Sequence, residues 1–110
     1  MSDRLDLRSR QVPRLKKKLP FVLEDGWRGE VVDLSAAGLR IECLAVLAPL
    51  STVEGTLTHE GKPLKVRAVV IWAEPPDHAS FLPAEVGLEL LDTSTEYLAL
   101  VATLFAEDDA

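Results

Sequence analysis

The sequence is poor in the residues from which most catalytic and metal sites are built. Its 110 residues include one cysteine and two histidines. Cys43 has no partner for an internal disulfide and lies in an apolar stretch, so we expect a buried thiol in a reducing compartment. His59 and His78 fall in polar turn or loop contexts without a partner at metal-ligand spacing. Since Gly-rich phosphate loops, nucleophile elbows and paired carboxylates are also missing, the sequence predicts neither an enzyme nor a metalloprotein.

Long apolar runs are missing too. No run approaches 18 residues, and the N-terminal stretch lacks the apolar segment of a signal peptide, so we expect a soluble, cytoplasmic protein without membrane spans. Aromatic residues make up only 5% of the chain, and none lies among the bases near the N-terminus. Binding to nucleic acid by stacking is therefore not expected.

Charge is distributed unevenly around a net value of −6. Residues 1–18 contain seven bases and two acids, a net charge of +5, whereas the remaining residues carry −11. A nucleic-acid-coating protein would spread its positive charge over the body. The pattern fits a local clamp for one anionic ligand, or equally a solvated basic terminus.

Short strands and turns are predicted over most of the chain. The alternation of apolar residues and the hairpin signals Asp25-Gly26 and Glu60-Gly61 favour antiparallel pairing. Alternation is imperfect at Val31-Val32, and Leu44–Leu50 fits either a short strand or a connector. The expected strands are Leu19–Glu24, Trp27–Leu34, Gly38–Cys43, Thr52–His59, Lys62–Ala73 and Ala84–Leu91.

A single helix is predicted at the C-terminus. An apolar stripe of helical period runs from Tyr97 to Phe105, and Thr93 followed by Glu96 has the pattern of a capping box. Three prolines make residues 74–83 a loop. The mainly β pattern indicates a closed barrel or a sandwich, with the helix covering one end or side.

Two short motifs that could bind an anionic ligand follow one another along the sequence. Arg10-Gln11-Val12-Pro13-Arg14 places two guanidiniums four residues apart, and Asp33-Leu34-Ser35-Ala36-Ala37-Gly38 follows at the end of a predicted strand. Together they resemble the RxxxR and (D/N)xSxxG signature of the PilZ family. Leu19-Pro20, Val69–Trp72 and Val86–Leu90 are similar to further parts of that family, and the likeness extends over residues 8–105.

The resemblance implies a fold and a ligand. The fold would be a six-stranded antiparallel β-barrel with a C-terminal helix. We expect residues 1–18 to form a basic arm, 19–106 the barrel plus helix, and 107–110 an acidic, frayed tail. The ligand would be the bacterial second messenger cyclic di-GMP, with no other cofactor. The protein would be a receptor that relays the signal, in motility for example, to an unidentified partner protein.

The ligand-binding residues implied are Arg10, Arg14, Asp33, Ser35 and Gly38. Arginine offers a planar fork that fits phosphate oxygens or a guanine edge and can stack on a base. A carboxylate accepts from guanine N–H groups, a serine adds a compact hydroxyl, and glycine permits a positive φ. For the aspartate and serine, the alternative is that they cap a local turn. Secondary candidates are Arg8, Ser9, Ala37, Trp72 and Gly87.

Several alternatives stay open at this stage. Trp72 shares the parity of core residues, so it either packs in the core or contacts a guanine. Gly87 provides clearance or marks a bulge. Arg8 followed by Ser9 leaves open whether one ligand or a stacked pair is bound. The arm, residues 1–14, is expected to become ordered with ligand. The alternative function is a PilZ-like interaction module that binds a pilus, motility or signalling protein and no nucleotide.

Overall fold

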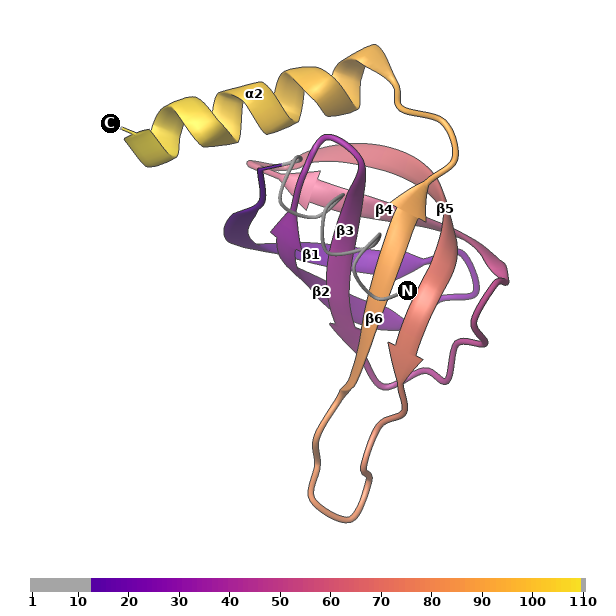
Figure 1. Ribbon diagram of the computed structural model, residues 1–110. Helices are drawn as coiled ribbons and strands as arrows, with labels where there is room; N and C mark the ends of the chain where they lie inside the picture. Colours follow the sequence, from indigo (N-terminus) through magenta and orange to yellow (C-terminus); the bar gives the residue numbers. More distant parts are fainter. Residues whose placement is uncertain (1–12, 110) are drawn as a thin grey trace.

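Six antiparallel strands close into a barrel in the computed structural model, which describes residues 13–109 (Figure 1). Their order around the barrel is β1-β2-β3-β6-β5-β4, and β1 pairs with β4 to close it. The fold expected from the resemblance is confirmed. The strands are β1 (Leu15–Leu23), β2 (Arg28–Leu34), β3 (Gly38–Cys43), β4 (Thr52–His59), β5 (Lys62–Glu74) and β6 (Ala84–Leu90).

Several strand ends differ from expectation by one residue, and two element boundaries differ by more. Strand β1 begins at Leu15, so the three lysines Lys16–Lys18 belong to a barrel strand rather than to the arm. The helix α2 (Thr95–Asp109) includes the acidic residues expected to form a frayed tail. Residues 44–50 form a connector, which is hydrogen-bonded to β5 from Leu50 N–H to Val70 O (2.6 Å).

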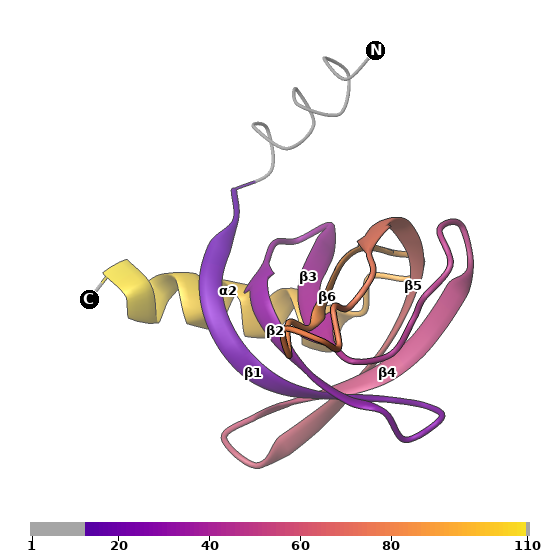
Figure 2. The same ribbon diagram turned by 90° about the horizontal axis from the view of Figure 1, so that it is seen from below.

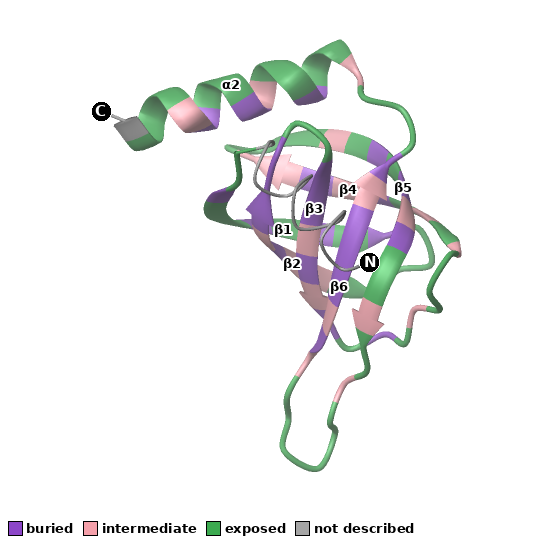
Figure 3. Ribbon diagram, viewed as in Figure 1, coloured by how far each residue is buried: buried purple, intermediate pink, exposed green. Residues whose placement is uncertain are grey.

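Every strand contributes buried residues, which are purple in Figure 3, and the side chains of these residues form the core of the barrel. Phe21, Val31, Ile41, Leu57 and Val86 are at most 1% exposed. Burial of an aliphatic or aromatic side chain of this size contributes about 1.5–3 kcal/mol relative to exposure. The alternating pattern that predicted the strands therefore reflects which side chains fill this space.

Three β-bulges interrupt the alternation. They lie in β1 between Lys16 and Leu19, in β2 between Val31 and Asp33, and in β5 between Val70 and Trp72. A bulge inserts one extra residue and redirects the side chains beyond it. The bulge in β2 accounts for the irregular Val31-Val32 pair. The bulge in β5 places Trp72 on the outside, 39% exposed, so the alternative that it packs in the core is wrong.

The two predicted hairpin turns have the backbone that their sequences require. Gly26 has a φ of 97° between β1 and β2. Between β4 and β5, Glu60 and Gly61 have φ values of 52° and 80°, as in a type I′ turn. That turn twists in the same sense as the strands that it joins.

Helix α2 lies across one end of the barrel (Figures 1 and 2). Its buried side chains, Tyr97, Val101 and Leu104, cover the core at that end. The cap of the helix is Ser94, whose hydroxyl accepts the Tyr97 N–H at 3.0 Å, and not Thr93 as the sequence suggested. Within residues 13–109, no helix is long and apolar enough to cross a membrane.

The loop between β5 and β6 extends away from the end of the barrel that α2 covers (Figure 1). Its tip is closed by reciprocal backbone hydrogen bonds of 2.9 Å between Asp77 and Leu82, and the Asp77 carboxylate accepts the N–H groups of Ala79 and Ser80. Phe81 is 88% exposed there, with a φ of 57°. A non-glycine residue in this left-handed region is strained. The tip therefore holds an aromatic side chain in solvent on an ordered backbone.

We expect Ser94→Ala to lower the free energy of unfolding by about 1 kcal/mol, because it removes the acceptor at the start of α2. Chemical denaturation measures this loss. Thr93→Ala is the matched control and should change the value by less than about 0.5 kcal/mol. A larger loss for the Thr93 variant would contradict the assignment of the cap.

Candidate functional site

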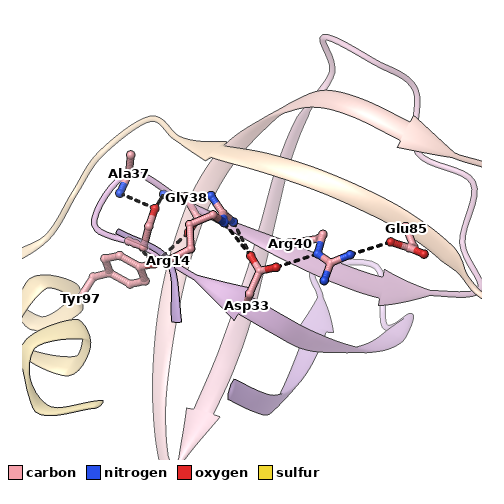
Figure 4. Close-up of polar contacts among 8 residues, drawn as sticks. Arg14, Asp33, Ala37, Gly38, Arg40, Glu85 and Tyr97 are labelled. Atoms are coloured by element: carbon pink, nitrogen blue, oxygen red, sulfur yellow. Dashed lines mark hydrogen bonds and ion pairs between the residues drawn. The ribbon is translucent and has the colours of Figure 1, made fainter. Parts of the chain in front are cut away.

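A line of alternating charges crosses the outer surface of the barrel (Figure 4). One oxygen of the Asp33 carboxylate accepts from Arg14, at 2.9 Å from Nε and also from Nη2. The other oxygen accepts from Arg40 Nε at 2.7 Å. Arg40 Nη1 in turn donates to Glu85 at 2.8 Å. We call the side chains of Arg14, Asp33, Arg40 and Glu85 the ion-pair chain.

The strand register places the ion-pair chain next to an exposed aromatic ring, that of Trp72. Asp33 on β2 is paired with Arg40 on β3, and Arg40 with Gly87 on β6. Gly87 is paired with Trp72 on β5. A carboxylate, a guanidinium and an indole therefore lie in one row across the outside of β2, β3, β6 and β5. The bulges in β2 and β5 set this row, because they bring Asp33 and Trp72 to the outer face.

Trp72 lies directly over Gly87. A Cβ built on Gly87 would lie 2.2 Å from the indole Nε1, so no larger residue fits beneath the ring. The bulge at this position belongs to β5 and not to Gly87 itself. The glycine is thus needed for clearance, and what occupies that space in this structure is the Trp72 ring.

Ser35 forms the turn between β2 and β3. Its hydroxyl accepts the N–H groups of Ala37 (3.1 Å) and Gly38 (3.2 Å), and its own N–H donates to Gly38 O (2.9 Å). The residue is fully buried. In this conformation its hydroxyl shapes the turn and offers no exposed surface to a ligand, as in the turn-capping alternative.

The glycine of this turn has a different role from the one expected. The φ of Gly38 is outside the left-handed region, so conformational freedom is not the reason for glycine there. A Cβ would instead lie 2.2 Å from the carbonyl oxygen of Leu88. Glycine lets β3 and β6 approach at the start of β3. Ala37 is exposed, and its carbonyl accepts the Leu90 N–H at 2.9 Å.

Tyr97 joins the turn to helix α2. Its buried hydroxyl donates to Ser35 O at 2.6 Å and lies 3.3 Å from Gly38 O. Burial raises the pKa of the Tyr97 phenol, and the nearby positive charge of Arg14 opposes that shift in part. The turn, the helix and the ion-pair chain therefore meet at one end of the barrel.

The structure brings together only some of the predicted residues. Arg14 contacts Asp33, and Trp72 covers Gly87, whereas Arg8, Ser9 and Arg10 lie outside the described residues. The sequence reading missed Arg40, Glu85 and Tyr97. For Arg40 a signal was available, since it is a base on the outward parity of β3, two residues after the motif glycine. Nothing local in the sequence pointed to Glu85 or Tyr97, because their contacts span 45 and 62 residues.

Beside the ion-pair chain is an open hollow of about 310 Å³ with a basic lining. Arg40 borders it on one side. The rest of the lining is Lys16, Lys17, Lys18, Val32 and Glu42. The bulge in β1 leaves all three lysines exposed. Their combined charge favours the approach of an anion to this face.

The described residues contain little that suggests catalysis. Burial raises the pKa of the Cys43 thiol, which disfavours the reactive thiolate. Potential ligand atoms of His59, Glu60 and Glu107 lie within 4.8 Å of one another where the β4–β5 hairpin meets the end of α2. Both glutamates are exposed, and such a surface group by itself does not make a metal site.

The sequence matches the family model described as "PilZ domain" over residues 4–107. The chain belongs to the PilZ domain family. PilZ domains are cyclic di-GMP-binding and adaptor modules rather than catalysts. A search of curated proteins found no match.

A solved structure with a similar fold is that of the Bacillus subtilis inhibitor of motility (MotI/DgrA). The TM-score is 0.71 at 19% sequence identity, and the alignment covers 90% of this chain. It covers 50% of that protein, so the present chain spans about half its length. At this level of identity the likeness supports the PilZ fold.

The buried phenol predicts a specific alkaline weakness. Tyr97→Phe should lower the free energy of unfolding by about 1–2 kcal/mol at pH 7, because the carbonyls of Ser35 and Gly38 lose their donor. Burial raises the pKa of the Tyr97 phenol in the folded protein, so the phenol ionises at lower pH in the unfolded chain. The contribution of the Tyr97 hydroxyl to the free energy of unfolding therefore declines as pH rises above about 10. Denaturation at pH 7 and pH 11 should show the advantage of wild type over the variant shrinking. An equal advantage at both pH values would contradict the assignment.

Proposed function

We propose that this PilZ domain is a receptor for cyclic di-GMP that passes the signal to a partner protein. The observation that carries the proposal is the row on the outer face of the barrel, in which Arg14 and Arg40 flank Asp33 and Trp72 lies over Gly87. Cyclic di-GMP has two phosphates and two guanines. Guanidiniums fit the phosphates and the guanine edge, and an indole offers a stacking surface.

The roles within the motif are proposed as follows. Arg14, whose side chain is 39% exposed, binds the ligand directly together with Arg10. Trp72 stacks on a guanine. Ser35 and Gly38 act by fixing the turn, and Asp33 acts mainly by orienting arginines, because both of its oxygens already accept from guanidiniums.

A path for the signal follows from the position of Tyr97. Its hydroxyl links α2 to the same turn that follows Asp33. A ligand that draws Arg14 and the N-terminal segment over this face changes the surface offered next to α2. A partner that recognises one of the two surfaces would sense the ligand. A role in motility, the process named for the Bacillus protein, is one candidate for the pathway.

The second candidate function is a protein-docking module that binds no nucleotide. The observation that favours it is Phe81, held almost fully exposed at the tip of the β5–β6 loop. Exposed, preorganised aromatic side chains are typical anchors of protein interfaces. Such a module would not need the arginines, so ligand titration separates the two functions.

We expect calorimetric titration with cyclic di-GMP to give a dissociation constant between high nanomolar and tens of micromolar, about −8 kcal/mol at the centre. Arg14→Ala should weaken binding by about 2–4 kcal/mol, because the charge-assisted fork is lost. Lys17→Ala is the control, a base of β1 outside the motif, and should cost less than about 1 kcal/mol.

Two outcomes would contradict this proposal. Absence of heat from wild type at 100 μM ligand, roughly a hundredfold excess over a micromolar constant, would leave the docking module as the function. Equal losses for the arginine and lysine variants would show a diffuse electrostatic patch instead of a motif.

Ligand binding should also protect the N-terminal segment from hydrogen exchange. Contacts from Arg10 and Arg14 would hold residues 4–14 against the barrel, so their amides should exchange more slowly with saturating cyclic di-GMP than without it. The β4–β5 hairpin serves as an internal reference. Strong protection of residues 4–14 in the free protein would show that the site is preformed and that the switch lies elsewhere.

A further inference from the structure

Asp33 is shared between two arginines, one inside the sequence motif and one outside it. Arg14 occupies one carboxylate oxygen and Arg40 the other. The Asp33 side chain is only 11% exposed. A carboxylate with so little solvent is costly to leave without a partner.

Ligand binding would change the hydrogen-bond partners of the Asp33 carboxylate. Arg14 uses Nε and Nη2 for Asp33, and these are the two donors of one fork edge. To give that edge to a phosphate, Arg14 has to leave Asp33. Arg40 is then the remaining guanidinium on Asp33 among residues 13–109.

The Arg40 side chain is held in place by two ion pairs. Its Nε donates to Asp33 on β2 and its Nη1 to Glu85 on β6, so the side chain is held from both neighbouring strands. It comes from β3, a central strand of this face, and is less exposed than Arg14. The hydrogen bond that Arg40 donates to Asp33 raises the pKa of Arg40 further, so the guanidinium keeps its charge.

We propose that Arg40 is the positioning residue of the cyclic di-GMP site: it keeps Asp33 paired while Arg14 turns to the ligand. Glu85 fixes Arg40 and tunes the charge of the site. This inference rests on the proposed function. The four charges of the ion-pair chain cancel, and when Arg14 is engaged by the ligand the other three sum to −1. That residual charge lies next to an anionic ligand, so Glu85 should oppose binding.

The variants follow from this charge balance. Arg40→Gln should weaken cyclic di-GMP binding about tenfold, because Asp33 then retains Arg14. Arg40→Lys keeps the charge but cannot bond both carboxylates as a guanidinium does, so its loss should be intermediate, about threefold. Glu85→Gln retains an acceptor for Arg40 and removes the negative charge, and should tighten binding about twofold to threefold.

The control is Arg67→Gln on β5, which breaks an exposed ion pair (3.3 Å) with Asp92 in the segment after β6. Its dissociation constant should stay within about twofold of wild type. In an Arg14→Ala background, Arg40→Gln should weaken binding by less than it does in wild type, because the part of its effect that acts through Arg14 is lost. A merely structural defect would weaken binding equally in both backgrounds. That outcome, or unchanged binding by Arg40→Gln, would overturn the proposal.

A ligand-free measurement separates this inference from the proposed function. Because both arginines pair with one carboxylate, Arg14→Gln and Arg40→Gln together should lower the free energy of unfolding by more than the sum of the single changes. If wild type fails to bind cyclic di-GMP, the receptor function is wrong, and this cycle decides whether Asp33 is shared. Additive losses would overturn the sharing of Asp33, and with it the role of Arg40.

Discussion

The Asp33 carboxylate, almost buried between two guanidiniums, is the interaction around which the candidate site is organised. It requires an arginine at the entrance to β1 and another on β3, and both are present within hydrogen-bonding distance. It also requires an outward-facing position on β2, which the bulge after Val31 supplies. Removal of both arginines would leave a nearly buried carboxylate without these two partners, so at least one arginine has to stay paired with it.

The same end of the barrel joins this carboxylate to the helix. Ser35, two residues after Asp33, closes the turn with its hydroxyl, and Tyr97 holds the turn to α2 through the Ser35 carbonyl. The hydrogen bonds that form the turn and the contact that holds α2 to the barrel are thus made by neighbouring residues. Asp33 therefore lies two residues from Ser35, whose carbonyl oxygen accepts the hydrogen bond from Tyr97 of α2. Under the proposed function, this proximity would couple a change at the ligand site to the surface next to α2.

The barrel was largely predictable because every strand contributes its inward side chains to one core, and this burial leaves an alternating pattern in the sequence. Gly38–Cys43 and Thr52–His59 were predicted with their observed bounds, since alternation and hairpin glycines mark them clearly. Trp72 was ambiguous because parity assumes a regular strand, and the β5 bulge reverses it. Such a bulge depends on the pairing of β5 with β6, which the local sequence does not encode. The contacts of Glu85 and Tyr97 were out of reach for the same reason, because they join segments that only the closed barrel brings together.

The most direct test of a cyclic di-GMP site on this face is a titration followed by the two indole N–H signals in nuclear magnetic resonance. Trp72 lies over Gly87 beside the ion-pair chain, whereas Trp27, 50% exposed in the β1–β2 turn, is an internal control. We predict that cyclic di-GMP shifts the Trp72 signal in a saturable manner and leaves Trp27 unchanged. An unshifted Trp72 signal at saturating ligand, or equal shifts of both indoles, would contradict the account.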